Sequence, residues 1–168
     1  RNKMLNLREL DLSDAEVRAC SYEYYTGFCT QDNKLGGYAF SELNLRVVHL
    51  PKNLTEITNC FNACPYLDTV YCQTGIQKIG NNTFRDSKAL RYVEVKEGVK
   101  EIGEYAFYGT TGLETLNLPN SLETIGSSAF AYSGVKSITI PANVTTIRSS
   151  AFSNGYLERL AFAPNGKL

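Results

Sequence analysis

The chain holds few side chains that could perform chemistry, and they do not form a recognisable catalytic set. His49 is the only histidine among 168 residues, and it lies in a different segment from Cys20 and Cys29. A catalytic nucleophile needs a base beside it, and the sequence offers no such constellation, no P-loop and no dinucleotide fingerprint. We therefore expect no catalytic residue, no cofactor and no enzymatic activity.

Three acidic residues cluster near the start of the chain: Asp11, Asp14 and Glu16. Carboxylate oxygens can bind calcium, but this spacing matches no known calcium loop. Acidic residues also favour the first turn of a helix, and the pattern favours such a helix cap. The sequence therefore predicts no metal site.

The five cysteines fall into two groups. An odd number excludes a fully paired monomer, and the absence of any C-x-x-C pair argues against zinc. We expect Cys60, Cys64 and Cys72 to be small buried core residues. Cys20 and Cys29 are candidates for a disulfide, which would require an oxidising compartment.

The composition is typical of a folded globular domain with balanced charge. Apolar residues make up 43% of the chain, and 17 basic residues balance 17 acidic ones. This balance gives no reason to expect a nucleic-acid or anionic-membrane partner, and no apolar run is long enough to span a bilayer. We expect a monomer, and the opening Arg1 allows a mature or trimmed product.

A strand-like motif, apolar-x-x-apolar-x-apolar, recurs along the chain. An early copy begins at Leu7, and successive later copies are 22 or 23 residues apart. That period lies in the leucine-rich-repeat range of roughly 20–29 residues. The later copies begin at Leu45, Leu67, Leu90, Leu113, Val135 and Leu157.

Other positions repeat with the same period. An apolar pair follows each of the first five later strands, and Gly80, Gly103 and Gly126 come directly after three of these pairs. We expect the glycines to adopt positive φ in a turn. A phenylalanine then recurs, and we expect these rings to stack in one column on the far side of the coil. The phenylalanines are Phe40, Phe61, Phe84, Phe107, Phe130 and Phe152.

The full pattern, I-P-x-x-V-x-x-I-G-x-x-A-F, is nearly complete in residues 118–130 and 140–152. It resembles the BspA-like, or treponemal, class of leucine-rich repeat over roughly residues 43–162. The resemblance implies an α/β leucine-rich-repeat solenoid, right-handed, with mostly short parallel strands, tight turns and little helix. It also implies surface exposure on anaerobic gut or oral bacteria and adhesion to host or neighbouring-cell proteins. Trichomonad surface proteins share the repeat, so the source kingdom stays open.

The repeats predict one domain over residues 1–168. Residues 1–42 form an atypical first repeat or N-terminal cap with an insertion at 18–34, residues 43–162 hold the regular repeats, and residues 163–168 form the C-terminal end. The end at Leu168 fits either a short cap or an interrupted longer array.

The insertion is rich in aromatic residues. Tyr22, Tyr24, Tyr25 and Phe28 lie between Cys20 and Cys29. Insertions in repeat proteins often emerge on the binding face, which makes these residues candidates for partner contact. Terminal repeats are also atypical because they cover an exposed core end, and the cap is the favoured interpretation. The two roles are compatible.

Two residues per strand are expected to point outward between the buried positions. Around the centre these are His49, Tyr71, Tyr92, Glu94 and Asn117. Their mixture of aromatic and polar groups suits contact with a protein or a glycan, although tyrosine and threonine are also good strand formers. Together with the surface exposure and adhesion that the resemblance implies, these residues favour a cell-surface adhesion module for an extracellular-matrix or cell-surface protein. The alternative is a structural spacer with no partner.

One column of the repeat alternates in charge from strand to strand. Opposite charges would then lie side by side on neighbouring coils, which favours the correct register over a slipped one. We expect Arg91→Glu to lower the melting temperature. The column consists of Arg46, Asp68, Arg91, Glu114, Lys136 and Glu158.

Overall fold

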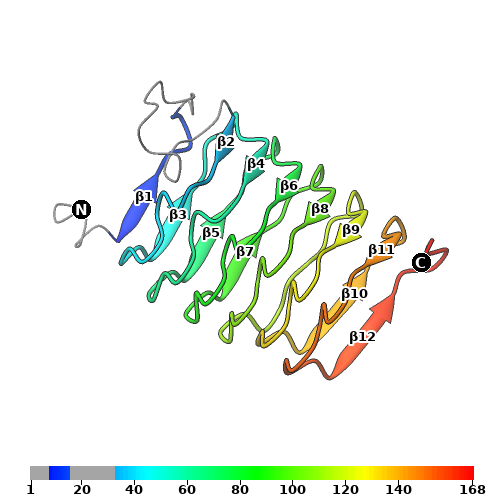
Figure 1. Ribbon diagram of the computed structural model, residues 1–168. Coiled ribbons are helices and arrows are strands. Elements are labelled where there is room, and N and C mark those ends of the chain that lie inside the picture. The colour runs from blue at the N-terminus through cyan, green and yellow to red at the C-terminus, as the bar shows by residue number, and fades with distance from the viewer. Residues whose placement is uncertain (1–7, 16–32) are drawn as a thin grey trace.

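The computed structural model describes residues 8–15 and 33–168 and shows a solenoid of short parallel strands, with no helix in these ranges. The coils stack side by side from one end of the molecule to the other (Figure 1). The predicted repeat solenoid with little helix is confirmed. The strands are β1 Glu9–Asp11, β2 Lys34–Leu35, β3 Val47–His49, β4 Glu56–Ile57, β5 Thr69–Tyr71, β6 Lys78–Ile79, β7 Tyr92–Glu94, β8 Glu101–Ile102, β9 Thr124–Ile125, β10 Ser137–Ile140, β11 Thr146–Ile147 and β12 Arg159–Phe162.

The first strand of each coil lies on one side of the solenoid, which we call the strand face. β1, β3, β5 and β7 form a four-stranded parallel sheet, and β10 and β12 form a separate pair. Val48 aligns with Val70, and Val70 aligns with Val93. Residues 22 or 23 apart in sequence are therefore direct neighbours, as the period predicts.

The second strand of each coil builds a longer sheet. Six two-residue strands follow one another without interruption in the order β11-β9-β8-β6-β4-β2. Ile57, Ile79, Ile102 and Ile125 occupy equivalent positions on successive strands and are fully buried. This sheet joins every coil from residue 34 to residue 147 (Figure 1).

The phenylalanines stack in one column, as expected. Neighbouring ring centroids lie 5.2–5.7 Å apart from Phe40 to Phe152, with the rings nearly parallel. The backbone N–H of each phenylalanine in the column from Phe40 to Phe130 also donates to a carbonyl of the next coil, at 2.7–3.0 Å. Stacked rings and backbone hydrogen bonds therefore hold the same edge of the solenoid together.

The expected role of the repeat glycines is wrong. Gly80, Gly103 and Gly126 do not have positive φ. A Cβ atom on each would instead lie only 2.5–2.6 Å from an atom of the preceding coil, so glycine is required for close approach of the backbones. The left-handed conformation occurs two residues later, at Asn82, Tyr105 and Ser128.

The core follows the predicted positions except at the last strand. The motif residues from Leu45 to Ile140 are buried or nearly so. Leu160 and Phe162 were expected to be buried, but they are 43% and 53% exposed. The reason is that β12 pairs with β10 on one side only, so no described coil covers its other side.

The three repeat cysteines are buried, as expected, and act as small apolar residues. Cys60, Cys64 and Cys72 are free thiols with almost no exposed surface. Burial raises the pKa of Cys64 and of Cys72 to about 12 and raises that of Cys60 well above its usual value. Cys20 and Cys29 lie outside the described residues, so their pairing stays a prediction.

The acidic residues near the start of the chain do not cap a helix within residues 8–15. The Ser13 N–H donates to Asp11 Oδ1 at 2.9 Å, which forms a local turn. This hydrogen bond lowers the pKa of Asp11. Asp14 forms an ion pair with Lys52 at 3.1 Å, and Glu16 lies outside the described residues.

The alternating charge column stacks as expected, but it forms few ion pairs. The backbone N–H of Asp68 donates to Arg46 O and that of Arg91 donates to Asp68 O, both at 2.9 Å. Of the expected side-chain pairs in this column, only Lys136 with Glu114 lies within ion-pair distance, at 2.9 Å. The expected pairing therefore holds at one step of the column.

A second column of alternating charge, not expected from the sequence, lies on the six-stranded sheet. Lys34 pairs with Glu56, and Lys78 pairs with Glu101, each at 3.1 Å. The four residues precede the repeat apolar position by one residue and are spaced by the same period. That spacing is the signal by which they could have been found.

Candidate partner-binding surface

The strand face carries an aromatic patch formed by His49, Tyr71 and Tyr92. β3 and β5 align His49 with Tyr71, whose ring centroids are 4.6 Å apart with an interplanar angle of 17°. Tyr92 lies diagonally opposite on β7, with its ring centroid 5.9 Å from that of Tyr71. Alternate residues of a strand point to the same side, so parallel pairing brings all three rings to one surface.

The patch is accessible and has a charged rim. Tyr92 is 47% exposed, and His49 and Tyr71 are half-buried. Glu9 Oε1 lies 3.8 Å from His49 Nε2. Glu94 aligns with Tyr71 and accepts a hydrogen bond from Lys96, which raises the pKa of Lys96. An apolar centre with a polar rim is typical of protein-binding surfaces.

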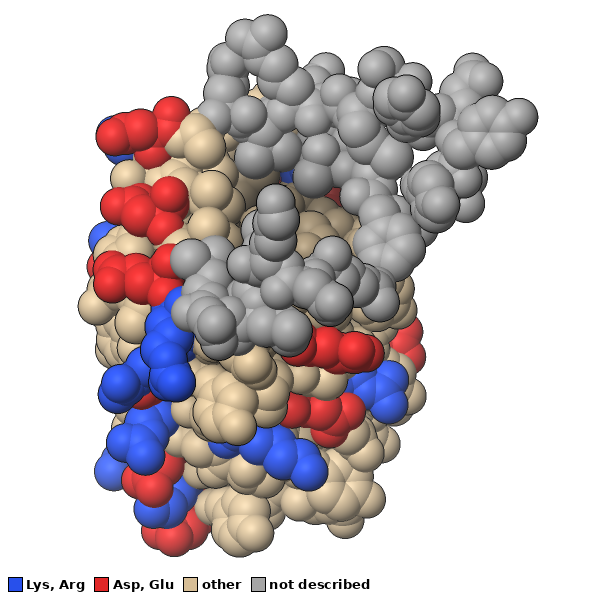
Figure 2. Space-filling view, turned by 90° about the vertical axis from the view of Figure 1, so that its left-hand side faces the viewer, with Lys and Arg blue, Asp and Glu red and all other residues tan. Residues whose placement is uncertain are grey.

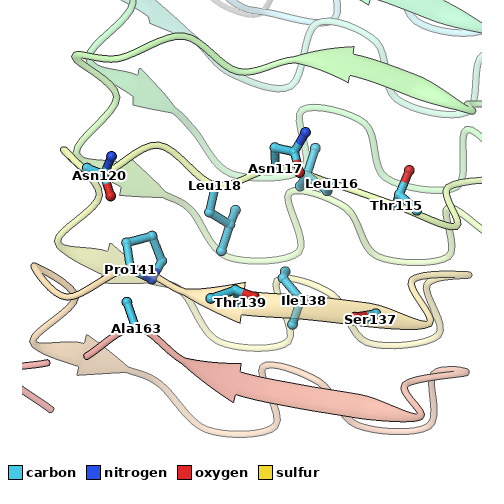
Figure 3. A pocket seen from close by; sticks show the side chains of 10 residues that line it. All are labelled: Thr115, Leu116, Asn117, Leu118, Asn120, Ser137, Ile138, Thr139, Pro141 and Ala163. Carbon is cyan, nitrogen blue, oxygen red and sulfur yellow. The ribbon is translucent and has the colours of Figure 1, made fainter.

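Asn117 is the one described candidate that does not join this group. Its segment, residues 115–118, forms no strand, and its recorded pairing is a single bridge between Thr115 and Ser137. Asn117 instead lines an open hollow of about 330 Å³ between this segment and β10, with Pro141 and Ala163 at one end (Figure 3). The structure therefore gathers His49, Tyr71, Tyr92 and Glu94 on paired strands, whereas Asn117 lies on a segment that does not pair with β7.

The turn from the phenylalanine column to the strand face shortens after the unpaired segment 115–118. Residues 62–66, 85–89 and 108–112 are turns of five residues, the first two of which lead into β5 and β7, whereas residues 131–134 form a turn of four residues that leads into β10. At that shorter turn the backbones meet closely, since a Cβ on Gly134 would lie 2.1 Å from Thr111 O. Equal repeat positions thus enter the strand face by turns of unequal length.

The candidates in the insertion cannot be placed on this surface. Tyr22, Tyr24, Tyr25 and Phe28 lie outside the described residues. Their contribution to partner contact therefore stays a prediction from sequence.

A second aromatic group, not expected from the sequence, lies beside the phenylalanine column, on what we call the phenylalanine side. Tyr108 contacts Tyr105 and Tyr132, with ring centroids 5.6 and 5.2 Å apart. The Arg85 guanidinium carbon lies 5.3 Å from the Tyr105 ring and 5.2 Å from the Tyr108 ring. These cation–π contacts give the group a structural role. Positions that flank each repeat phenylalanine could have indicated it.

The described residues offer surface contacts more readily than chemistry. No group of three or more His, Cys, Asp or Glu side chains gathers in residues 8–15 and 33–168 as a metal site would require. No described helix could cross a membrane. His49, the only imidazole of the chain, stacks on a tyrosine ring. This arrangement can bind a partner through aromatic contact, charge and hydrogen bonds.

Comparison with solved proteins places this architecture among bacterial repeat proteins. A leucine-rich repeat protein from Bacteroides ovatus is 26% identical, with a TM-score of 0.68, over 91% of this chain and 44% of its own. One from Eubacterium ventriosum is 25% identical, with a TM-score of 0.69, over 92% and 44%. A leucine rich cell surface protein from Faecalibacterium prausnitzii shares the fold at 23% identity and a TM-score of 0.56, over 96% and 48%.

The chain spans less than half the length of each of these three proteins, and no curated protein matches it. The family model for the BspA type leucine rich repeat region, however, matches residues 33–158 in six copies. Because this match covers most of the sequence, the chain belongs to the BspA-type leucine-rich repeat family.

Proposed function

We propose that the chain is a cell-surface recognition module that binds an extracellular-matrix or cell-surface protein through its strand face. The observation that carries the proposal is the aromatic patch, in which His49, Tyr71 and Tyr92 follow one another on neighbouring strands. Exposed tyrosines dominate many protein interfaces because they combine a large apolar ring with a hydrogen-bonding tip. The cell-surface location is supported by the description of the Faecalibacterium prausnitzii protein as a cell surface protein.

The position of the patch supports recognition over a purely structural role. A spacer would need stacked coils but no exposed aromatic residues on the strand face. Tyr92 leaves 47% of its surface exposed, although the strands beneath it are already paired through their backbones. Its exposed ring therefore adds little to stacking and is available to a partner.

The test is a binding screen against extracellular-matrix and plasma proteins by surface plasmon resonance, with matched variants. Tyr71→Ser/Tyr92→Ser removes the two tyrosines of the patch. Tyr108→Ser/Tyr132→Ser is the control, since Tyr132 is also 47% exposed but lies on the phenylalanine side. We expect the first variant to weaken binding by more than about tenfold, as for interface hot spots, and the control to bind normally.

Two outcomes would contradict the proposal. If the unmodified chain binds none of the proteins, the spacer becomes the better interpretation. If the two double variants lose affinity equally, the strand face is not the binding surface. Thermal melts of both variants separate a loss of contact from a loss of folding.

The insertion needs its own variant. Lys34 of β2 pairs with Glu56, and the Asn33 carbonyl accepts a hydrogen bond from the Thr55 N–H at 2.7 Å, so a deletion that reaches these residues would damage the six-stranded sheet. Substituting serine for the insertion's aromatic residues leaves both contacts in place. Weaker binding by that variant would support partner contact by the insertion. Unchanged binding would favour a capping role alone. The substituted residues are Tyr22, Tyr24, Tyr25 and Phe28.

A further inference from the structure

A second feature lies beside the aromatic patch, at the end of the strand face where β1, β3, β5 and β7 begin. It is a shallow hollow of about 370 Å³. Four basic side chains, Arg8, Arg46, Lys88 and Arg91, line it together with a single acidic one, Asp68. We call it the cationic hollow.

The cationic hollow has a local charge excess, although the net charge of the whole chain is zero. None of its charged residues takes part in an ion pair within the described part of the chain. Glu114, the next acidic residue of the column, pairs with Lys136 and not with Arg91. Charge is also unevenly spread elsewhere, since acidic side chains follow one edge of the end view and basic ones gather below them (Figure 2).

Arg8, Arg46, Asp68 and Arg91 occupy successive rungs of the solenoid. The Arg46 N–H donates to Arg8 O, the Asp68 N–H to Arg46 O, and the Arg91 N–H to Asp68 O. Neighbouring strands lie about 4.8 Å apart, so Arg46 and Arg91 flank Asp68 at about 10 Å from one another. A guanidinium group presents a planar fork of donors that matches carboxylate and similar oxyanions. Three such forks therefore face one hollow.

We propose that the cationic hollow binds an anionic oligosaccharide that carries sulfate or carboxylate groups. Tyr66, which is 59% exposed, adds a ring face and a hydroxyl to the rim. Ala89 and Gly112 are the remaining lining residues, and their small side chains leave room for a ligand between the arginine side chains. Arginine clusters also bind acidic peptide motifs. The open hollow, however, offers a peptide no free strand edge, whereas the exposed Tyr66 ring offers a sugar ring a flat face beside the arginine side chains.

This inference extends the proposed function by naming a ligand class, but it depends on different residues. Arg91 and Tyr92 are adjacent in sequence, so one partner could contact both surfaces. The two proposals nevertheless fail separately. A protein bound only by the aromatic patch would be lost in Tyr71→Ser/Tyr92→Ser, whereas an oligosaccharide bound in the cationic hollow would be retained by that variant.

Isothermal titration calorimetry at low salt tests the assignment, with a heparin-derived oligosaccharide as the probe. Arg46→Gln/Arg91→Gln should lower the affinity by about tenfold or more, since charge-assisted hydrogen bonds are lost. Asp68→Asn should raise it by roughly two- to fivefold, because a repulsive charge is removed. Arg148→Gln is the matched control, as Arg148 is exposed and lies beyond β11 on the six-stranded sheet.

The gain expected for Asp68→Asn keeps the test valid even if the arginine variant folds poorly, because misfolding cannot raise affinity. The assignment is overturned if Asp68→Asn weakens binding, if Arg148→Gln has the same effect as the double variant, or if the probe does not bind. Equal binding of a desulfated probe would show that the cationic hollow does not recognise the sulfate charges, and would also contradict the assignment. Preferential binding of a poly-glutamate peptide would replace the oligosaccharide with an acidic polypeptide.

Discussion

The two sides of the solenoid differ in how regularly they are built. On the framework side, which we define as the six-stranded sheet together with the phenylalanine column, every coil bonds to the next. The N–H groups of Gly80, Gly103 and Gly126 donate to isoleucine carbonyls at 2.6–2.7 Å, and ring stacking continues from Phe40 to Phe152. On the strand face the sheet ends at β7 and resumes at β10.

This difference indicates how one repeat can combine a regular framework with a variable outer surface. The framework side uses residue types that stack with copies of themselves, namely isoleucine, glycine and phenylalanine. On the strand face only the buried residues repeat, mainly as leucine and valine, while the outward residues change from coil to coil. A partner surface can therefore vary without loss of the stack.

The largest expected effect comes from removing a ring from the framework side. Phe107 is fully buried and stacks on Phe84 and Phe130. Phe107→Ala should lower the free energy of unfolding by about 3–5 kcal/mol, because it leaves a cavity in the column. Urea denaturation measures this loss. Tyr92→Ala on the strand face should cost about 1 kcal/mol or less, as its ring is half exposed, and equal losses would remove the distinction between the two sides.

A smaller effect is expected from adding one methyl group where coils approach most closely. A Cβ on Gly126 would lie 2.5 Å from the carbonyl carbon of Gly103. Gly126→Ala should therefore destabilise the fold by about 1–3 kcal/mol through overpacking. Gly166→Ala is the control, because its nearest neighbour would be Ala163 O at 3.5 Å. Similar denaturation midpoints for both variants would contradict the close-approach role.

Ion pairs should contribute less to the free energy of unfolding than the buried rings and the close coil contacts. Lys78 pairs with Glu101 on the framework side, whereas Arg91 forms no ion pair with any residue that the structure describes. Because the Lys78–Glu101 pair is partly exposed, Lys78→Gln should cost only about 0.5 kcal/mol at low salt. Arg91→Gln should change stability by less than that. A larger loss for Arg91→Gln would restore the register role that the alternating column suggested.

The smallest effect concerns a carboxylate that links coils across the interruption. Glu97 accepts hydrogen bonds from the Asn120 and Ser121 N–H groups at 2.9 and 3.1 Å, and the first of these chiefly lowers its pKa. A lowered folded-state pKa means that this stabilisation is present above the unfolded pKa, about 4.3, and is lost as pH falls through the folded value. Glu97→Gln should therefore melt slightly lower than the unmodified chain at pH 7 but equally at strongly acidic pH. A gap that persists in acid would exclude this origin.

The period of the sequence was sufficient to predict which residues are neighbours. Spacings of 22 or 23 residues correctly placed Phe84, Phe107 and Phe130 in one column and His49 beside Tyr71. Such equivalence follows directly from stacking of like coils. The fold and most of the aromatic patch could therefore be predicted from the sequence.

Other features depend on distances that a period does not contain. Glycine is compatible both with positive φ and with close backbone approach, and only the structure shows that Gly103 serves the second purpose. Asn117 occupies the repeat position equivalent to Glu94, yet its segment does not pair as a strand. The charges of Arg46 and Arg91 alternate with Asp68 in sequence, but their long side chains do not reach it as ion pairs.

The most direct test of the difference between the two sides is amide hydrogen exchange followed residue by residue by NMR. The amides of Gly80, Gly103, Gly126, Phe84, Phe107 and Phe130 should exchange slowly and at similar rates, since each donates to a neighbouring coil. The amides of residues 116–118 should exchange at least about tenfold faster. Equal protection of residues 116–118 would show that the strand face is continuous and would contradict this description of the molecule.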